Sequence, residues 1–229
     1  TPQTIFLKDY TEPNHWIDNV DLRIELGEEE TLVHSTLSMR RNPNRPADGA
    51  LVLDGQDMEL RAISINGEAL AESDYVVGEE TLSIAKTPDE FRLVTTVAIK
   101  PQENTALEGL YKASGIFCTQ CEAEGFRKIT YYLDRPDVMA DFSTTIVGDK
   151  KLYPVLLSNG NPVERGDLDG GLHFVKWVDP FKKPAYLFAV VAGDLKHIED
   201  KYTTTSGREV LLQIFVEPEN IDKCDHAML

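Results

Sequence analysis

The stretch Val20-Asp21-Leu22-Arg23-Ile24-Glu25-Leu26 decides the fold, because its apolar and charged side chains alternate one by one. A period of two places all the apolar side chains on one face of an extended strand. Gly27-Glu28-Glu29 follows as a turn, and the next run carries Val33, Leu37 and Met39 on a single face. The sequence therefore predicts a β-hairpin over residues 20–39 with one buried face.

Similar short runs, separated by turn residues, continue to about Ile198 and predict a mostly β, mostly antiparallel chain. Asn66-Gly67 predicts a tight hairpin turn, and the prolines within residues 41–46 predict a loop. Residues 186–192 are almost all apolar, which predicts a strand buried on both faces. Helical character is confined to residues 138–142 and to the end from Pro218. Further strands are expected at residues 50–53, 60–65, 75–77, 81–84, 91–99, 142–146 and 172–176.

Composition narrows the function classes. The 229 residues include 23 Lys and Arg against 39 Asp and Glu, which gives a net charge of -16. This length can bury a real core, and the acidic balance would repel phosphates and anionic lipid, so we expect neither nucleic acid nor a membrane as partner. There is no apolar run of about 18 residues and no basic, then apolar, leader. Together with an odd count of three cysteines, this predicts a soluble protein of the reducing cytoplasm.

The run Cys118-Thr119-Gln120-Cys121-Glu122-Ala123-Glu124 holds the most informative polar pattern. If the run is extended, Gln120, Glu122 and Glu124 share one face, and Cys121 and Ala123 share the other. An amide beside a carboxylate suits an ammonium group, because the carboxylate supplies charge and the amide supplies a directional acceptor. We therefore predict a recognition edge for a cationic group at residues 120–122.

Plainer interpretations of this run stay open. Arg127 and Lys128 follow closely enough in the sequence to hold Glu122 in an ordinary surface salt bridge. Cys118 and Cys121 form a Cys-x-x-Cys pair, which would suit a redox pair or half of a zinc site. Because no second Cys or His pair and no thioredoxin-like pattern accompanies them, we predict two thiols flanking a strand.

Other conspicuous side chains are predicted to be structural. An isolated aromatic residue in an alternating strand belongs to the core more often than to a ligand platform, and His173, between Leu172 and Phe174, is predicted to face solvent. The same plain interpretation holds for His226 near the C-terminus. The aromatic residues in question are Trp16, Trp177, Tyr186 and Phe188.

Five blocks of sequence follow one another at residues 107–111, 118–137, 153–161, 177–181 and 183–195. In this order they resemble the N-terminal region of the aminopeptidase N type zinc enzymes, the gluzincin aminopeptidases, and in particular their bacterial members. The resemblance implies a large, saddle-like, antiparallel or mixed β-sheet domain over residues 1–194. It further implies that residues 195–229 are a strand and the first helix of a truncated, thermolysin-like α/β catalytic domain. In this family, Gln120 and Glu122 would bind the free α-amine of a peptide beside zinc, whereas Glu124 is given no role.

The residues that would perform the hydrolysis are missing from the sequence. His-Glu-x-x-His, in which two imidazoles hold zinc around a water-activating glutamate, cannot be formed by any of the five histidines. The family's Gly-Ala-Met-Glu-Asn motif is absent too. We therefore expect an N-terminal fragment of a zinc aminopeptidase, inactive alone, without catalytic or metal-binding residues of its own. Its partners would be a peptide N-terminus and the catalytic domain of the same protein.

Two alternatives belong to other function classes. The first is a catalytically dead family member, in which the β-domain is a scaffold. The second is an unrelated β-sandwich binding module, whose acidic face would be incidental. The presence or loss of His-Glu-x-x-His in the parent protein would separate the first from an active enzyme.

Overall fold

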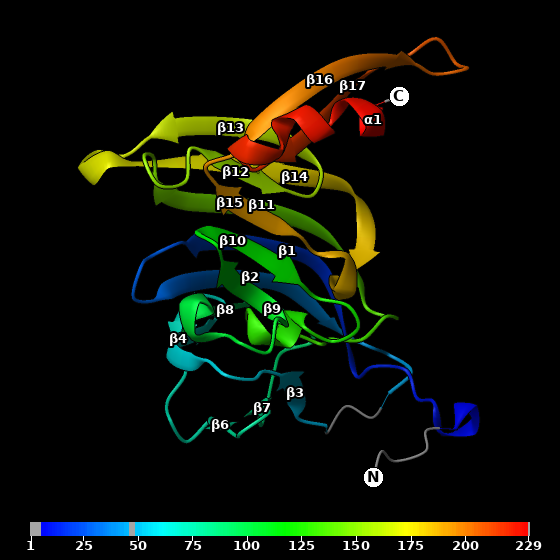
Figure 1. Ribbon diagram of the computed structural model, residues 1–229. Coiled ribbons are helices and arrows are strands. Elements are labelled where there is room, and N and C mark those ends of the chain that lie inside the picture. The colour runs from blue at the N-terminus through cyan, green and yellow to red at the C-terminus, as the bar shows by residue number, and fades with distance from the viewer. Residues whose placement is uncertain (1–5, 46–48, 229) are drawn as a thin grey trace.

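The computed structural model describes residues 6–45 and 49–228. Its largest element is an eight-stranded mixed sheet, in which only β1 and β11 are parallel neighbours (Figure 1). In spatial order its strands are β13 (Asn161–Asp167), β14 (Leu172–Pro184), β11 (Met139–Asp149), β1 (His15–Glu25), β2 (Thr31–Arg41), β8 (Glu90–Ile99), β4 (Glu59–Ile65) and β5 (Glu68–Ala69).

The hairpin predicted over residues 20–39 is confirmed as β1 and β2. Leu22 lies opposite Ser35 and Ile24 opposite Val33 in the antiparallel register. Val20, Leu22 and Ile24 are at most 1% exposed, so the alternation does turn one face of the hairpin into the core. The Asn66-Gly67 turn is confirmed as well, between β4 and β5.

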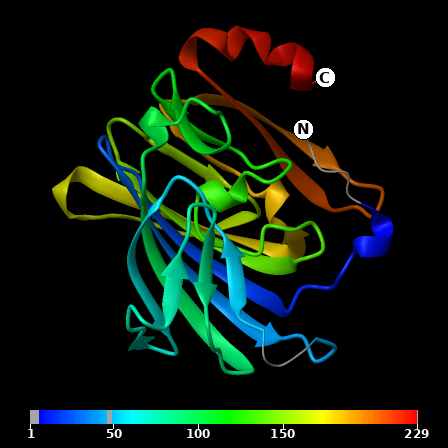
Figure 2. The ribbon, with the colours of Figure 1, turned by 90° about the horizontal axis from the view of Figure 1, so that it is seen from below.

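Three smaller sheets complete the fold, and the predicted mostly β class is confirmed. In Figures 1 and 2 the β16–β17 hairpin and the C-terminal helical segment lie on the opposite side of the molecule from the three-stranded sheet. The four-stranded sheet has the order β12 (Val155–Ser158), β15 (Val190–Gly193), β10 (Ile116–Gln120) and β9 (Gly109–Ala113). The three-stranded sheet has the order β3 (Leu51–Asp54), β7 (Thr81–Ile84) and β6 (Tyr75–Val77). The hairpin pairs β16 (Lys196–Thr203) with β17 (Glu209–Val216). Short 3₁₀ turns cover Leu7–Asp9, Pro101–Glu103, Phe126–Lys128, Asp169–Gly171, Ala185–Leu187 and Pro218–Lys223, and α1 covers Asp225–Met228.

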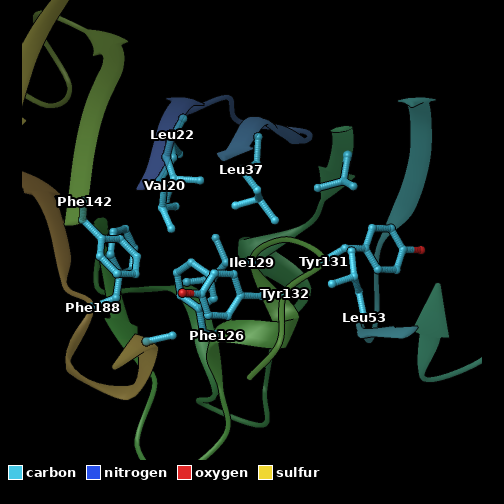
Figure 3. Close-up of a cluster of buried hydrophobic side chains, with 14 of the residues drawn as sticks. Val20, Leu22, Leu37, Leu53, Phe126, Ile129, Tyr131, Tyr132, Phe142 and Phe188 are labelled. Atoms are coloured by element: carbon cyan, nitrogen blue, oxygen red, sulfur yellow. The ribbon is translucent and has the colours of Figure 1, made fainter. Parts of the chain in front are cut away.

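The core lies between the large sheet and the segments that cross its inner face. Figure 3 shows Val20, Leu22 and Leu37 of β1 and β2 facing Phe126 and Tyr132. Phe126 is fully buried, and its ring lies edge-on to that of Tyr132 at 4.9 Å between centroids. It meets Phe188 in the same way at 5.1 Å. The segment that follows β10 is therefore anchored in the core by an aromatic side chain.

Two predictions of secondary structure were wrong. Residues 138–142 are not helical, because Met139 begins strand β11, whose alternate residues Ala140 and Phe142 are buried between β1 and β14. Residues 186–192 are not one strand, because Ala185–Leu187 forms a 3₁₀ turn and β15 begins only at Val190. In both places pairing with distant strands overrides the local pattern. The helical character predicted from Pro218 is confirmed.

The prediction that His173 faces solvent was also wrong. His173 is buried, and its Nε2 lies 2.7 Å from the backbone oxygen of Tyr153. Among the four aromatic residues predicted to be core, Phe188 is buried and Trp177 packs against the core, whereas Trp16 and Tyr186 are only half-buried.

In the described ranges, no helix combines the length and the apolar character that crossing a bilayer requires.

Candidate functional site

Strand β10 carries Gln120 to the edge of the core. Its β-branched and aromatic residues favour a strand, and Phe117 is fully buried. Thr119 Oγ1 accepts a hydrogen bond of 2.9 Å from the backbone N–H of Val190 in β15. On the other side, Gln120 lies opposite Gly109 of β9. Gln120 is thus the last residue of a strand that is held on both edges.

The chain does not stay extended after Gln120, so the condition for Gln120, Glu122 and Glu124 to share a strand face is not met. Residues 122–125 form a turn, closed by a hydrogen bond of 2.7 Å from Gly125 N–H to the Cys121 carbonyl, and the Glu122–Ala123 peptide bond is cis. Cys121 is buried, whereas Ala123 is exposed, so these two do not share a face. Local chain reversal replaces the strand because Phe126 must return to the core.

Gln120 and Glu122 nevertheless come together at the surface. The Gln120 side-chain amide donates a hydrogen bond of 3.2 Å to the backbone carbonyl of Glu122. This contact uses the amide nitrogen and leaves the amide oxygen available as an acceptor. Both residues are exposed. The pair thus offers one carboxylate and one amide oxygen to an outside cation.

The surface salt bridge considered for Glu122 does not form among the described residues. Arg127 contacts Glu124 at 3.4 Å and Asp134 at 3.1 Å. Lys128 contacts Asp57 at 3.2 Å and Glu108 at 3.3 Å. Both nearby cations are therefore committed to other carboxylates, and the carboxylate of Glu122 has no ion-pair partner within residues 6–45 and 49–228.

Arg127 belongs to a polar network beneath the turn that sequence reasoning missed. Its Nε donates to Asp134 Oδ2 at 3.1 Å, and its Nη2 donates to the Asp134 carbonyl at 3.2 Å. Burial opposes the charge of Arg127, but Asp54, Asp134 and Glu124 more than offset this and raise its pKa. Burial also raises the pKa of the Asp134 carboxyl, and the hydrogen bonds from Arg127 limit that rise. No local pattern in the sequence marks this network, because Asp54 and Asp134 lie 80 positions apart.

Two glycines allow the turn to lie against β9. A Cβ atom on Gly125 would lie 2.5 Å from the Gln120 carbonyl oxygen and 2.9 Å from the Gly109 nitrogen, both in the backbone. Gly109 has a φ of +72°, and a Cβ there would lie 2.7 Å from Lys128 Cβ. Side chains at these positions would push the turn, and Glu122 with it, off the strand.

Cys121, beside the site, is a buried and unreactive thiol. Burial, with a smaller contribution from the charge of Asp134, raises the pKa of the Cys121 thiol to about 12. Cys121 is therefore a neutral thiol at pH 7 and a poor nucleophile or metal ligand. Cys118, Cys121 and Cys224 are all free. Across the part of the chain that the structure describes, no three His, Cys, Asp or Glu side chains are grouped so that they could hold a metal ion.

Comparison with known proteins gives this geometry a family. The sequence matches the Peptidase M1 N-terminal domain family over residues 12–187. This chain belongs to that family. The chain is 50% identical to aminopeptidase N of Caulobacter vibrioides over 228 residues, which are 100% of this chain and 26% of the relative. It is 46% identical to aminopeptidase N of Escherichia coli over 227 residues, which are 99% of this chain and 26% of that relative.

Solved structures agree with the family. The crystal structure of aminopeptidase A of Legionella pneumophila in complex with aspartic acid matches 97% of this chain and 26% of that chain, with a TM-score of 0.92 and 38% sequence identity. An M1 zinc metallopeptidase variant of Deinococcus radiodurans, bound to a Tyr-Ser-Ala substrate, matches with a TM-score of 0.75. At 16% identity, over 90% of this chain and 48% of that one, the second match shows a shared fold. The chain spans about a quarter of the length of the curated relatives it matches.

Proposed function

We propose that this chain is the amine-recognition part of a zinc aminopeptidase that removes N-terminal amino acids from peptides. Glu122 supplies the charge for the substrate α-amine, and Gln120 supplies a neutral acceptor beside it. The observation that carries the proposal is the exposed carboxylate of Glu122, which has no ion-pair partner within residues 6–45 and 49–228 and lies next to cations that are committed elsewhere. The family and the names of the relatives, all of them aminopeptidases, support the same reaction class.

Charge explains how one carboxylate can select a free N-terminus. A free α-amine has a pKa of about 7.7 to 8 and is mostly cationic at neutral pH. A carboxylate about 4 Å away attracts it by about 1 kcal/mol in water, and by about 4 kcal/mol at an effective dielectric constant near 20. An internal peptide bond has no cation there and would leave the carboxylate desolvated and unpaired. Selectivity therefore requires a second surface that excludes water from Glu122.

The second surface and the metal belong, in this proposal, to a catalytic domain of the same protein. The described residues hold no group suited to zinc, so its ligands would have to come from outside them. When bound, zinc would polarise the scissile carbonyl and activate water. The role of the M1 domain is limited to binding and orienting the amine. We propose a boundary at residues 194 and 195, with the β16–β17 hairpin on the catalytic side.

The β16–β17 hairpin supports such a partner by its two unlike faces. On one face Ile198 lies opposite Ile214 and Tyr202 opposite Val210, and the pair between them is Asp200 with Leu212, so this face is apolar except for Asp200. The other face is more polar, because it pairs Glu199 with Gln213 and Lys201 with Leu211. On the apolar face Tyr202 stays 56% exposed, and so it can be covered by further protein.

For location we propose the reducing cytoplasm, and the three free thiols support it.

The test is Glu122→Ala in the full-length protein, assayed on N-terminal amino acid amides. We expect kcat/KM to fall at least about tenfold, or about 1.4 kcal/mol, with zinc content unchanged. Gln120→Ala should cost less, because it removes a neutral acceptor. Glu72→Gln, at an exposed position with no contact to the turn, is the matched control. Unaltered kinetics for Glu122→Ala would remove Glu122 from the site, and a parent protein inactive on every amide would favour the scaffold alternative.

A further inference from the structure

Arg127 lies where three segments of the chain meet beneath the Glu122 turn. Its side chain is 17% exposed and reaches Asp134 at 3.1 Å, Glu124 at 3.4 Å and Asp54 at 3.9 Å. These carboxylates come from the segment after Tyr132, from the turn itself and from the end of β3. One guanidinium group therefore connects the turn to two other parts of the fold.

Backbone hydrogen bonds make this junction rigid. The Arg127 N–H donates to Asp134 Oδ2 at 3.1 Å, and the Gln56 N–H donates to the Arg127 carbonyl at 2.9 Å. The Asp134 N–H donates to Asp54 Oδ2 at 3.0 Å. Asp54 and Tyr132 also exchange two backbone hydrogen bonds, at 2.7 and 3.0 Å. The backbone of Arg127 and both of its inner partners, Asp134 and Asp54, are therefore fixed to the fold independently of the contact between the guanidinium and Glu124.

The contact with Glu124 carries this rigidity to the turn. Glu122 is exposed and lies between Gln120, which ends β10, and Glu124, which Arg127 holds. The strand fixes the chain before Glu122, and the guanidinium holds the chain after it. A planar guanidinium can serve three acceptors at once, whereas the ammonium group of lysine keeps the charge without that fixed fork.

Arg127 also controls the charge around Glu122. Asp134 is only 3% exposed, so its carboxylate depends on a buried partner. Without the guanidinium, the carboxylates of Asp54, Asp134 and Glu124 would repel one another, and the exposed Glu124 would be free to leave its place. Movement of Glu124 would shift the backbone of the turn and, with it, Glu122, which lies two residues earlier in the same turn.

We propose that Arg127 is a positioning residue, which fixes the place of the Glu122 carboxylate by holding Glu124 against the buried Asp134 and Asp54. The inference rests on the proposed function of Glu122 in binding the substrate amine. Arg127 itself does not touch the amine, so its contribution must pass through the turn.

The experiment is a double-mutant cycle in the full-length enzyme, with Arg127→Lys and Glu122→Gln. We expect Arg127→Lys to lower kcat/KM on amino acid amides about tenfold, mostly through a higher KM. In the Glu122→Gln background the same change should cost less than about twofold, because the group it positions is already gone. Equal fold-changes in both backgrounds would overturn the inference. If Glu122→Gln alone has no effect, the proposed function fails first, and this inference fails with it.

Arg135→Lys is the matched control, because Arg135 lies eight positions further along and binds Asp137 at 2.9 and 2.6 Å and the Thr11 carbonyl at 2.8 Å. None of these partners belongs to the turn at residues 121–125. Arg135→Lys should therefore change kcat/KM less than about twofold. A loss equal to that of Arg127→Lys would show a merely structural role and would overturn the inference.

Hydrogen exchange keeps the inference testable if Arg127→Lys is poorly stable. In the full-length protein, Arg127→Lys should speed amide exchange in peptides covering residues 121–128, and Arg135→Lys should not. If Arg127→Lys unfolds, Glu124→Gln takes its place in the experiment, since Glu124→Gln removes the ion pair with Arg127 at the exposed end of the network. Unchanged exchange at residues 121–128 in both variants would overturn the inference.

Discussion

At the scale of single residues, the site depends on close backbone approach as much as on charge. Gly125 lies so near β9 and β10 that its missing side chain decides where the turn lies. Its φ is -86°, a value that any residue can adopt, so the requirement for glycine is purely steric. The position of the Glu122 carboxylate therefore depends on the missing Cβ atom of Gly125, three residues further along the chain.

Gly125→Ala should therefore destabilise the protein. Its Cβ would meet the Gln120 carbonyl at 2.5 Å and the Gly109 nitrogen at 2.9 Å, and neither backbone atom can rotate away. We expect a loss of about 2 kcal/mol, measured by thermal or denaturant unfolding. Gly148→Ala is the control, because its nearest contacts would be at 3.5 Å, an ordinary van der Waals distance. Equal unfolding midpoints for the two variants would contradict the steric account.

At the scale of elements, strand β1 begins with a histidine that is buried without an opposing charge. His15 is 1% exposed, its Nε2 lies 3.1 Å from Thr87 Oγ1, and its ring lies edge-on to Phe91. Burial, and secondly the charge of Arg41, lowers its pKa from 6.5 to about 4. The start of the strand is thus packed around a neutral imidazole.

This predicts a specific acid dependence of stability. The unfolded chain takes up the His15 proton near pH 6.5 and the folded chain only near pH 4, so the unfolded state binds more protons between these values. The free energy of unfolding should therefore fall as the pH drops from 6.5 to 4, by at most about 3 kcal/mol, and no further below pH 4 from this group. His15→Gln should flatten this part of the curve in urea unfolding series.

His34→Gln on β2 serves as the control for His15→Gln, because His34 is half-buried and lies 3.0 Å from Thr96 Oγ1 through its Nδ1. Any flattening that both variants share reflects the loss of an imidazole from the hairpin, and only the additional flattening in His15→Gln is assigned to the buried His15. Parallel curves for the wild-type protein and His15→Gln over this range would show that the buried imidazole does not couple folding to pH.

At the scale of the whole molecule, the eight-stranded sheet and its inner segments form one body, and the β16–β17 hairpin projects from it (Figure 1). The hairpin pairs only within itself among the described strands. A two-stranded hairpin alone is marginally stable in water, so its apolar face calls for a covering surface. In the proposed function that surface is the rest of the M1 protein.

Complementation tests this whole-molecule arrangement. We expect the 229-residue chain alone to lack amidase activity, and mixing it with the separately expressed remainder of the protein to restore activity. Leu212→Asp, on the apolar face, should weaken the recovery at least about tenfold, because it buries an unpaired charge. Leu211→Asp, on the other face, should not. Equal recovery with both variants would show that the apolar face is not the docking surface, and activity of the chain alone would refute the division of roles.

The sequence by itself determined the strands whose pattern is local and the identity of the exposed polar pair. Alternation over residues 20–26 predicts β1, Asn66-Gly67 predicts the turn between β4 and β5, and the spacing of Gln120 and Glu122 marks a polar pair. Each of these signals is contained within a few residues, because a strand period of two and a two-residue turn are properties of the backbone.

Only the tertiary structure decided which groups those residues meet. Arg127 could have paired with Glu122, yet it is drawn to Asp134, and Asp134 is held in turn by Asp54, 80 positions away in the chain. In the same way Phe126 packs into the core and bends the chain at Glu122, where alternation had predicted a strand. Burial and ion pairing choose partners by distance in space, which the order of residues does not record, and so the turn, its network and the free carboxylate appear only in the folded protein.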